Sequence, residues 1–323
     1  MTDLRYGVWT KSSITLYRTN QTEGGKLKSE GDKIQNHDMK KITKGVFWIH
    51  RPQLSVMAFL ISIAGISLAG RFDLVLMLEV GLLFWFIQCI AHPINDYTDR
   101  ESDKTGRPTA PIPAKLLTLK QVKIVIGLDY IIAAILILIM PLNLPVKILA
   151  TIAVVHTYIF SAPPIRTNAR GILASLTIAS VVIVAFIGGW TSAVGWRYDL
   201  VLVLLSLHIG STHMTAKNVA DIIDMNSDKK SGRVTLPMQI GINKSFYVAA
   251  FFGTFAVFLF FLAGFFGRMN ILYWVAGIVG SIITFLCLFY FQKDFGKVTG
   301  RKYFEISTLP TFIFPIAIIL GFL

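Results

Sequence analysis

The chain has 323 residues, of which 54% are hydrophobic, and its mean hydropathy is +0.62. This composition is typical of an integral membrane protein and excludes an ordinary soluble domain. The formal net charge of +13 comes from basic residues scattered among the connecting segments, so it does not indicate a nucleic-acid partner.

The amino-terminal part differs in composition from the rest of the chain. Residues 1–45 are polar and charged, and they contain no apolar segment of the kind that forms a cleavable signal peptide. We expect a flexible cytoplasmic tail over residues 1–45 and one membrane domain over residues 46–323.

Nine apolar stretches follow, each long enough, or nearly so, to cross a bilayer as a helix. They lie at about 53–70, 72–92, 122–141, 145–163, 171–190, 199–217, 245–266, 271–291 and 306–322. These runs lack the period-two alternation of a membrane β-barrel. The prediction is therefore an all-α polytopic protein with nine transmembrane helices.

The basic residues predict how these helices are oriented. If the amino terminus is cytoplasmic, 27 of the 31 Lys and Arg residues fall on the cytoplasmic side. An excess of Lys and Arg in cytoplasmic loops is the usual determinant of membrane topology. We therefore expect the loops after the second and sixth predicted helices to face the cytoplasm.

An acidic pattern occurs at the start of both of these loops. The first acidic motif is Asp96, Asp99 and Asp103, and the second acidic motif repeats the spacing with Asp221, Asp224 and Asp228. On a helix, residues at i, i+3 and i+7 share one face, so each motif presents three carboxylates together. Because such like charges repel, the pattern indicates a cation site, which we expect at exposed helix ends.

The residues after the two motifs are also alike, since both copies continue through Lys and Gly-Arg to Thr and Pro. Four predicted helices separate the motifs, an even number, so both have the same orientation across the membrane. This arrangement predicts a parallel internal repeat of a four-helix unit, with a ninth helix added.

Carboxylate oxygens are ligands for a hard cation such as Mg²⁺, which is commonly completed by substrate phosphate oxygens. Asn95 adds an amide beside the first motif. The neighbouring basic residues are suited to the outer oxygens of a diphosphate, and they are Lys104, Arg107, Lys229, Lys230 and Arg233. The two motifs therefore predict a site for Mg²⁺ and a diphosphate.

Here the sequence resembles a known family. The segment from Asn95 to Asp103 is similar to the N-D-x-x-D-x-x-x-D signature of the UbiA superfamily of intramembrane prenyltransferases, and residues 221–237 are similar to its second motif. Ser161-Ala162-Pro163-Pro164 and Arg51-Pro52 add to the likeness. The resemblance implies nine helices around a central cavity, Mg²⁺ bridging a prenyl diphosphate, and prenyl transfer to a lipophilic acceptor.

The resemblance also implies roles for particular residues. Its metal ligands are Asp96, Asp99, Asp103, Asp221, Asp224 and Asp228, of which we name Asp96, Asp99 and Asp221 as catalytic. The diphosphate candidates are Asn95, Arg107, Lys115, Arg166 and Lys229. The acceptor is either an aromatic quinone precursor or a glycerol phosphate ether lipid of the archaeal kind.

The chain departs from the family pattern at several positions. Ala110 stands where many members have an arginine, and Lys115 is placed to replace the missing charge. His92 stands where an asparagine is common, and Asn168 where a second basic residue often follows Arg166. These departures concern the diphosphate and the acceptor, not the metal ligands.

The sequence does not assign a role to several polar residues inside the predicted spans. Glu79 and Asp129 are ionisable groups in apolar helices, where a functional role is a reasonable expectation. His92 and His213 are candidates for contacting the acceptor or accepting a proton.

Two alternative functions remain at this point. The first is a phosphotransferase of the CDP-alcohol type, although its glycine-arginine spacing between aspartates is absent. The second is a divalent-cation transporter, which would place its ligands near mid-membrane on broken helices.

Overall fold

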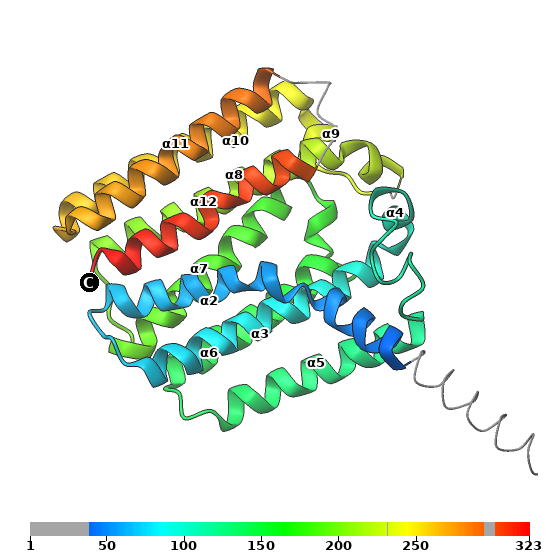
Figure 1. The fold of residues 1–323 in the computed structure, drawn as a ribbon, viewed down its shortest axis with the longest axis horizontal. Helices are drawn as coiled ribbons and strands as arrows, with labels where there is room; N and C mark the ends of the chain where they lie inside the picture. The colour runs from blue at the N-terminus through cyan, green and yellow to red at the C-terminus, as the bar shows by residue number, and fades with distance from the viewer. Residues whose placement is uncertain (1–38, 231, 294–300) are drawn as a thin grey trace, which may run out of the picture.

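The computed structural model describes residues 39–230, 232–293 and 301–323, so that most of the predicted tail lies outside the described residues. The described chain is a bundle of long helices that run side by side (Figure 1). Residues 39–50 are helical and are followed by α2 (Pro52–Leu68), α3 (Leu74–Thr98), α4 (Arg100–Gly106), α5 (Leu119–Ile139), α6 (Leu144–Ser161), the 3₁₀ turn η1 (Thr167–Ala169), α7 (Ile172–Val194), α8 (Leu200–Lys230), α9 (Leu236–Ile240), α10 (Ile242–Gly267), α11 (Ile271–Lys293) and α12 (Arg301–Leu320). The predicted all-α class is confirmed.

Eight helices within the described ranges are long and apolar enough to cross a membrane. The ninth predicted span corresponds to α12, whose apolar stretch Glu305–Leu320 is shorter. The sixth span was predicted to end at residue 217, and that boundary is wrong because α8 continues to Lys230. Hydropathy falls where the second acidic motif begins, but the backbone remains helical through it.

The order of the elements divides the bundle into two similar halves. The first half contains α2, α3, α5 and α6, and the second contains α7, α8, α10 and α11. In each half a short helix, α4 or α9, follows the second long helix. Figure 1 places α4 and α9 at the same end of the bundle, which we call the motif end because both acidic motifs lie there. The last helix, α12, packs against α2, α8 and α11.

Side-chain caps fix where several helices begin. The Asp73 carboxylate accepts hydrogen bonds from the first backbone N–H groups of α3, and Asn143 does the same for α6. Thr118 and Gln121 form a reciprocal capping box at the start of α5. These caps satisfy N–H groups that have no partner within the helix.

Two glycines allow α2 and α7 to cross closely. A Cβ atom at Gly189 would overlap the carbonyl oxygen of Ser62, and one at Gly65 would overlap the carbonyl oxygen of Phe186. Since lipid provides no hydrophobic force between helices, close backbone approach of this kind is a main source of packing energy in membranes. The crossing joins the first helices of the two halves.

We predict that Gly189→Ala lowers the thermal unfolding temperature in detergent, because the added methyl group must push α2 away from α7. Gly127→Ala is the matched control, since nothing lies within 4 Å of a Cβ built at Gly127 in α5. The control is expected to retain or slightly raise stability, by up to about 1 kcal/mol. Equal unfolding temperatures for the two variants would contradict the role assigned to the crossing.

Candidate active site

Three segments that are distant in sequence meet at the motif end. They are the end of α3 with α4, the connection between α6 and α7, and the end of α8 with the loop that follows it. The backbone N–H of Gly171 donates to the carbonyl of Val234 at 2.8 Å, which joins the second segment to the third. A Cβ built at Gly106 lies 3.3 Å from Cβ of Ser227, so the first and third segments also touch. The two acidic motifs therefore border one site.

Arginines neutralise the first acidic motif. The Asp96 carboxylate pairs with Arg51, and its Oδ1 also lies 2.8 Å from Nη2 of Arg107. The same Arg107 donates from Nε to Oδ1 of Asp103 at 3.0 Å. Arg107 therefore connects the first and last aspartates of its own motif.

Asp99 connects the first motif to the other segments. Its Oδ1 accepts a hydrogen bond from Nη2 of Arg166 at 2.7 Å, and its Oδ2 lies 3.4 Å from Nη1 of Arg233. Nη1 of Arg233 is also 2.9 Å from Oδ1 of Asp228. One guanidinium thus bridges the two motifs, while Asp221 pairs with Lys217 one turn earlier on α8.

Two of these arginines have an unusual backbone conformation. Arg51 has φ +46° and Arg166 has φ +40°, both in the left-handed region that side chains rarely adopt. Such a conformation costs of order 1–3 kcal/mol and persists where surrounding contacts over-determine it. Both residues direct their guanidinium groups at carboxylates of the first motif.

The expectation that the acidic helix ends are exposed is wrong for five of the six aspartates. The buried ones are only 1–6% exposed, and they are Asp96, Asp99, Asp103, Asp221 and Asp228. Asp224 is exposed and forms no recorded ion pair with a described residue. These five carboxylates are paired with basic side chains, which is the condition under which buried carboxylates are tolerated. Burial raises the pKa of Asp103, although the nearby Arg107 opposes that shift.

Buried polar atoms without a hydrogen-bond partner are concentrated at this site. Among carboxylates, Oδ2 of Asp96 and Oδ2 of Asp221 have no partner among the described residues. Among donors, Nε of Arg166 and Nε of Arg233 have none. Unsatisfied groups of this kind call for an explanation such as a missing ion or ligand. Free acceptors and free donors in one site match a ligand that contains both a cation and an anion.

The donor chemistry fits a divalent metal. Carboxylate oxygens are the ligands that Mg²⁺ prefers, and two of them have spare capacity. Within residues 39–230, 232–293 and 301–323, however, no three His, Cys, Asp or Glu side chains converge on one point. The carboxylates are gathered around arginines instead. Their chemistry suits a divalent metal, but the distances between them are set by their ion pairs with these arginines.

Of the other diphosphate candidates, one lies inside the site and two are exposed to solvent. Asn95 lies inside the site, where its Oδ1 accepts a hydrogen bond from Nδ2 of Asn168 at 3.1 Å. Lys115 and Lys229 are exposed, and neither makes a recorded ion pair with the described residues. Their roles stay predictions, as do the catalytic roles of the aspartates.

Sequence reasoning did not select three of the pairing cations. Arg233 was named beside the second motif but not chosen as a site residue, Arg51 was noted only as part of the family resemblance, and Lys217 was not named. The spacing of Lys217 four residues before Asp221 was a usable signal, since residues at i and i+4 are neighbours on a helix. Nothing in the local sequence indicates that Arg51 reaches Asp96.

The remaining ionisable candidates lie outside this network. Asp129 pairs with His50, whose Nε2 is 3.0 Å from Oδ2 of the carboxylate. His213 contacts the backbone of Ile209 and the sulfur of Met57. His92 has a buried Nε2 without a partner among the described residues. Glu79 makes no recorded ion pair in the described part of the chain.

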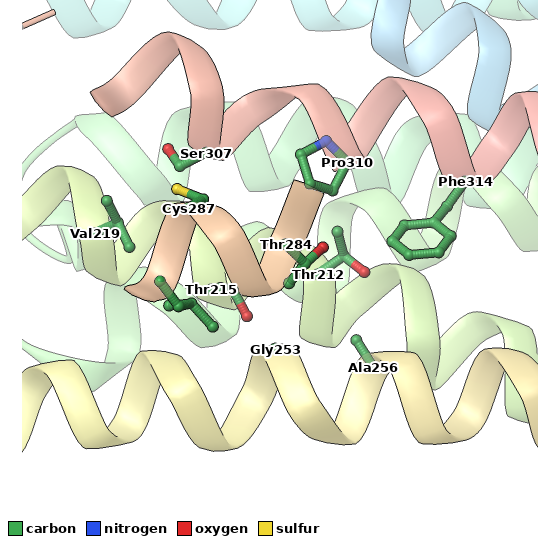
Figure 2. A pocket seen from close by; sticks show the side chains of 11 residues that line it. Thr212, Thr215, Val219, Gly253, Ala256, Thr284, Cys287, Ser307, Pro310 and Phe314 are labelled. Carbon is green, nitrogen blue, oxygen red and sulfur yellow. The ribbon is translucent and has the colours of Figure 1, made fainter. Parts of the chain in front are cut away.

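Two pockets in the described part of the bundle bear on the site. One lies between α8, α10, α11 and α12, and Figure 2 shows Thr212, Thr284 and Pro310 among its walls. Val219 lines this pocket and also belongs to an apolar cluster with Phe246 and Phe291. The other is lined by Ala58, Phe84, Ile87, Gln88, Ala153, Thr157, Val181, Val182 and Ala185.

The second pocket adjoins the part of the bundle where α3 and α6 lead to the polar site. Gln88 precedes Asn95 by two turns of α3, and Thr157 precedes Ser161 by one turn of α6. Oγ of Ser161 lies 3.5 Å from Oδ1 of Asn95, so the two helices meet directly above the pocket. We call this space the Asn95 pocket.

The sequence is similar to a family of membrane prenyltransferases. The model of the UbiA prenyltransferase family matches residues 55–309. The digeranylgeranylglyceryl phosphate synthase of Pyrococcus furiosus is 29% identical over 224 residues, which are 68% of this chain and 77% of that protein.

Two solved structures support the same fold. A digeranylgeranylglyceryl phosphate synthase structure superposes with a TM-score of 0.64 at 24% identity, covering 87% of this chain and 98% of the other. A UbiA homologue from Archaeoglobus fulgidus, bound to GPP and Mg²⁺, superposes with a TM-score of 0.69 at 16% identity, covering 86% and 99%. At these identities the structural likeness establishes the fold alone.

We predict that Asp99→Asn destabilises the metal-free protein strongly, because it leaves Arg166 and Arg233 without their shared carboxylate. Removing one partner of a buried ion pair costs roughly 3–5 kcal/mol. Asp73→Asn is the matched control, since Asp73 and Arg71 form an exposed pair at the opposite end of α3, where solvent screens the charges and the loss of stability is small. Thermal unfolding of both variants in detergent with EDTA checks this; equal losses would contradict it.

Proposed function

Because the chain belongs to the UbiA prenyltransferase family and is a membrane prenyltransferase, we propose that it transfers a prenyl group to a glycerol phosphate ether lipid. The acceptor class comes from relatives that are digeranylgeranylglyceryl phosphate synthases. A product with two geranylgeranyl groups requires an acceptor that already carries one. The proposed reaction therefore joins geranylgeranyl diphosphate to geranylgeranylglyceryl phosphate.

The observation that carries this proposal is the combination of free groups between the two acidic motifs. The unpartnered oxygens of Asp96 and Asp221 suit divalent metal, and the unpartnered Nε atoms of Arg166 and Arg233 suit diphosphate oxygens. The metal ligands would come from Asp96, Asp99, Asp103, Asp221, Asp224 and Asp228. Magnesium, when bound, would neutralise the departing diphosphate and so make it a good leaving group.

The side chains of the site would then control the bond exchange. In the proposed reaction, the allylic carbon–oxygen bond of the donor breaks, a bond to the acceptor hydroxyl oxygen forms, and the hydroxyl proton is released. The arginines hold the diphosphate by charge-assisted hydrogen bonds as its negative charge develops. Burial of the carboxylates excludes water, which would otherwise compete with the acceptor.

The motif end is proposed to face the cytoplasm, because the loops at that end contain most of the Lys and Arg residues. We propose that the hydrocarbon chain of the donor enters the bundle at the Asn95 pocket, which is lined mainly by apolar side chains and begins two turns of α3 before Asn95. This orientation lets the diphosphate reach the acidic motifs while its chain stays in the membrane interior.

The main test is turnover by the purified protein in detergent. We expect pyrophosphate release from geranylgeranyl diphosphate only when both Mg²⁺ and geranylgeranylglyceryl phosphate are present, and loss of turnover with EDTA. Asp221→Asn is expected to reduce turnover by at least about 100-fold, because it removes a charged oxygen that stabilises the departing group.

Competing functions give different results in the same assay. Turnover with an aromatic hydroxy acid but not with the ether lipid would identify a quinone-precursor enzyme instead. Transfer of a phosphoryl alcohol from a CDP-alcohol would favour the phosphotransferase. Divalent-cation flux in liposomes without any turnover would favour the transporter.

A further prediction concerns the Asn95 pocket. Ala185→Phe should fill it and raise the KM for the donor, with a smaller effect on the KM for the acceptor. Ala256→Phe, which fills the pocket shown in Figure 2, is the matched control and should leave the donor KM unchanged. Thermal unfolding of both variants corrects for overpacking, which typically costs about 1–3 kcal/mol. An increase in donor KM for Ala256→Phe alone would place the chain in the other pocket.

A further inference from the structure

Arg107 and Arg233 occupy corresponding places after the two acidic motifs, yet they form different contacts. Each follows the glycine that comes after the last aspartate of its motif. Arg107 contacts Asp96 and Asp103, both in its own motif. Arg233 contacts Asp228 in its own motif and Asp99 in the other.

The sequence offers a physical reason for this difference. Arg107 follows Asp103 by four residues, so the helical spacing directs it back along α4. Arg233 follows Asp228 by five residues, and the additional residue precedes Gly232, whose φ is +70°. The chain leaves the helix at that turn, and Arg233 is therefore free to point across the site.

We infer that Arg233 acts as a stand-in cation, which holds the two acidic motifs together while no metal is bound. Its Nη1 lies between Oδ2 of Asp99 and Oδ1 of Asp228, where it reduces the repulsion between the two motifs. Its side chain is 15% exposed, so solvent screens the charges only weakly. Arg233 is thus a positioning residue that keeps the site assembled before the donor binds.

This inference takes from the proposed function only that both motifs bind one metal–diphosphate donor. A divalent cation that reached the same carboxylates would take over the neutralising role of the guanidinium. Arg233 would then be able to turn its donors toward diphosphate oxygens, and its unpartnered Nε is already available. The inference does not depend on the acceptor.

The close approach of Gly106 and Ser227 provides a reporter of the distance between the motifs. The built Cβ of Gly106 is 3.3 Å from Cβ of Ser227, close to the separation of about 3.5–4.5 Å that a disulfide needs. The chain has only two native cysteines, Cys89 and Cys287, both buried. The double variant Gly106→Cys/Ser227→Cys, with Cys89→Ser and Cys287→Ser, therefore reports disulfide formation between the motifs alone.

The test measures the rate of disulfide formation in the purified, metal-free protein under mild oxidation. We expect the disulfide to form rapidly when Arg233 is present. With Arg233→Gln the rate should fall by a factor of at least about ten, because the motifs then repel each other. Mg²⁺ should restore the rate in the Arg233→Gln protein, which also shows that this variant is folded. Arg107→Gln is the matched control, and it should lower the rate much less than Arg233→Gln does, because both ion pairs of Arg107 lie within its own motif.

Two outcomes would overturn the inference. One is an undiminished rate for Arg233→Gln without metal, and the other is a reduced rate that Mg²⁺ does not restore. Arg233→Met provides a second neutral variant if the glutamine variant does not purify. In an Asp99→Asn background the effect of Arg233→Gln should vanish, since the link between the motifs is already lost. Disulfide formation needs no turnover, so failure of the proposed prenyl transfer would be seen separately.

Discussion

The structure depends on the pairing of buried carboxylates with basic side chains at one end of a membrane bundle. Six aspartates lie there with five cations, which are Arg51, Arg107, Arg166, Lys217 and Arg233. Burial in a medium of low dielectric makes an unpaired charge costly, so the site is close to neutral before any ligand arrives. A ligand that brings balanced charge, such as a metal with a diphosphate, is accommodated more easily than a cation alone.

The same requirement shapes the loops around the site. The pairing arginines come from the three segments that meet at the motif end and, through Arg51, from the junction before α2, so that four separate segments must converge. Arg51 and Arg166 accept left-handed backbone conformations in doing so. Close packing elsewhere, as at Gly65 and Gly189, aligns the helices from which these loops extend. Local backbone strain is thus offset by ion pairs and by packing in the membrane.

The helical class, the two motifs and their common end could be predicted because they depend on local patterns. Hydropathy identifies apolar helices, and an even number of spans places two motifs on one side. The end of α8 was misplaced because hydropathy falls before the helix stops. The burial of Asp96 and Asp99 was missed because they have remote partners: Arg51 precedes Asp96 by 45 residues, and Arg166 follows Asp99 by 67. Such contacts depend on tertiary packing that no local pattern contains.

The internal repeat explains why a bridge between the motifs needs a departure from symmetry. If both arginines kept the four-residue spacing of Arg107, each would neutralise only its own motif, and the two acidic surfaces would still repel each other. One additional residue before Arg233 changes its direction and allows a single guanidinium to contact both. Two similar acidic units can therefore be joined into one ion-pair network through a small difference between the copies.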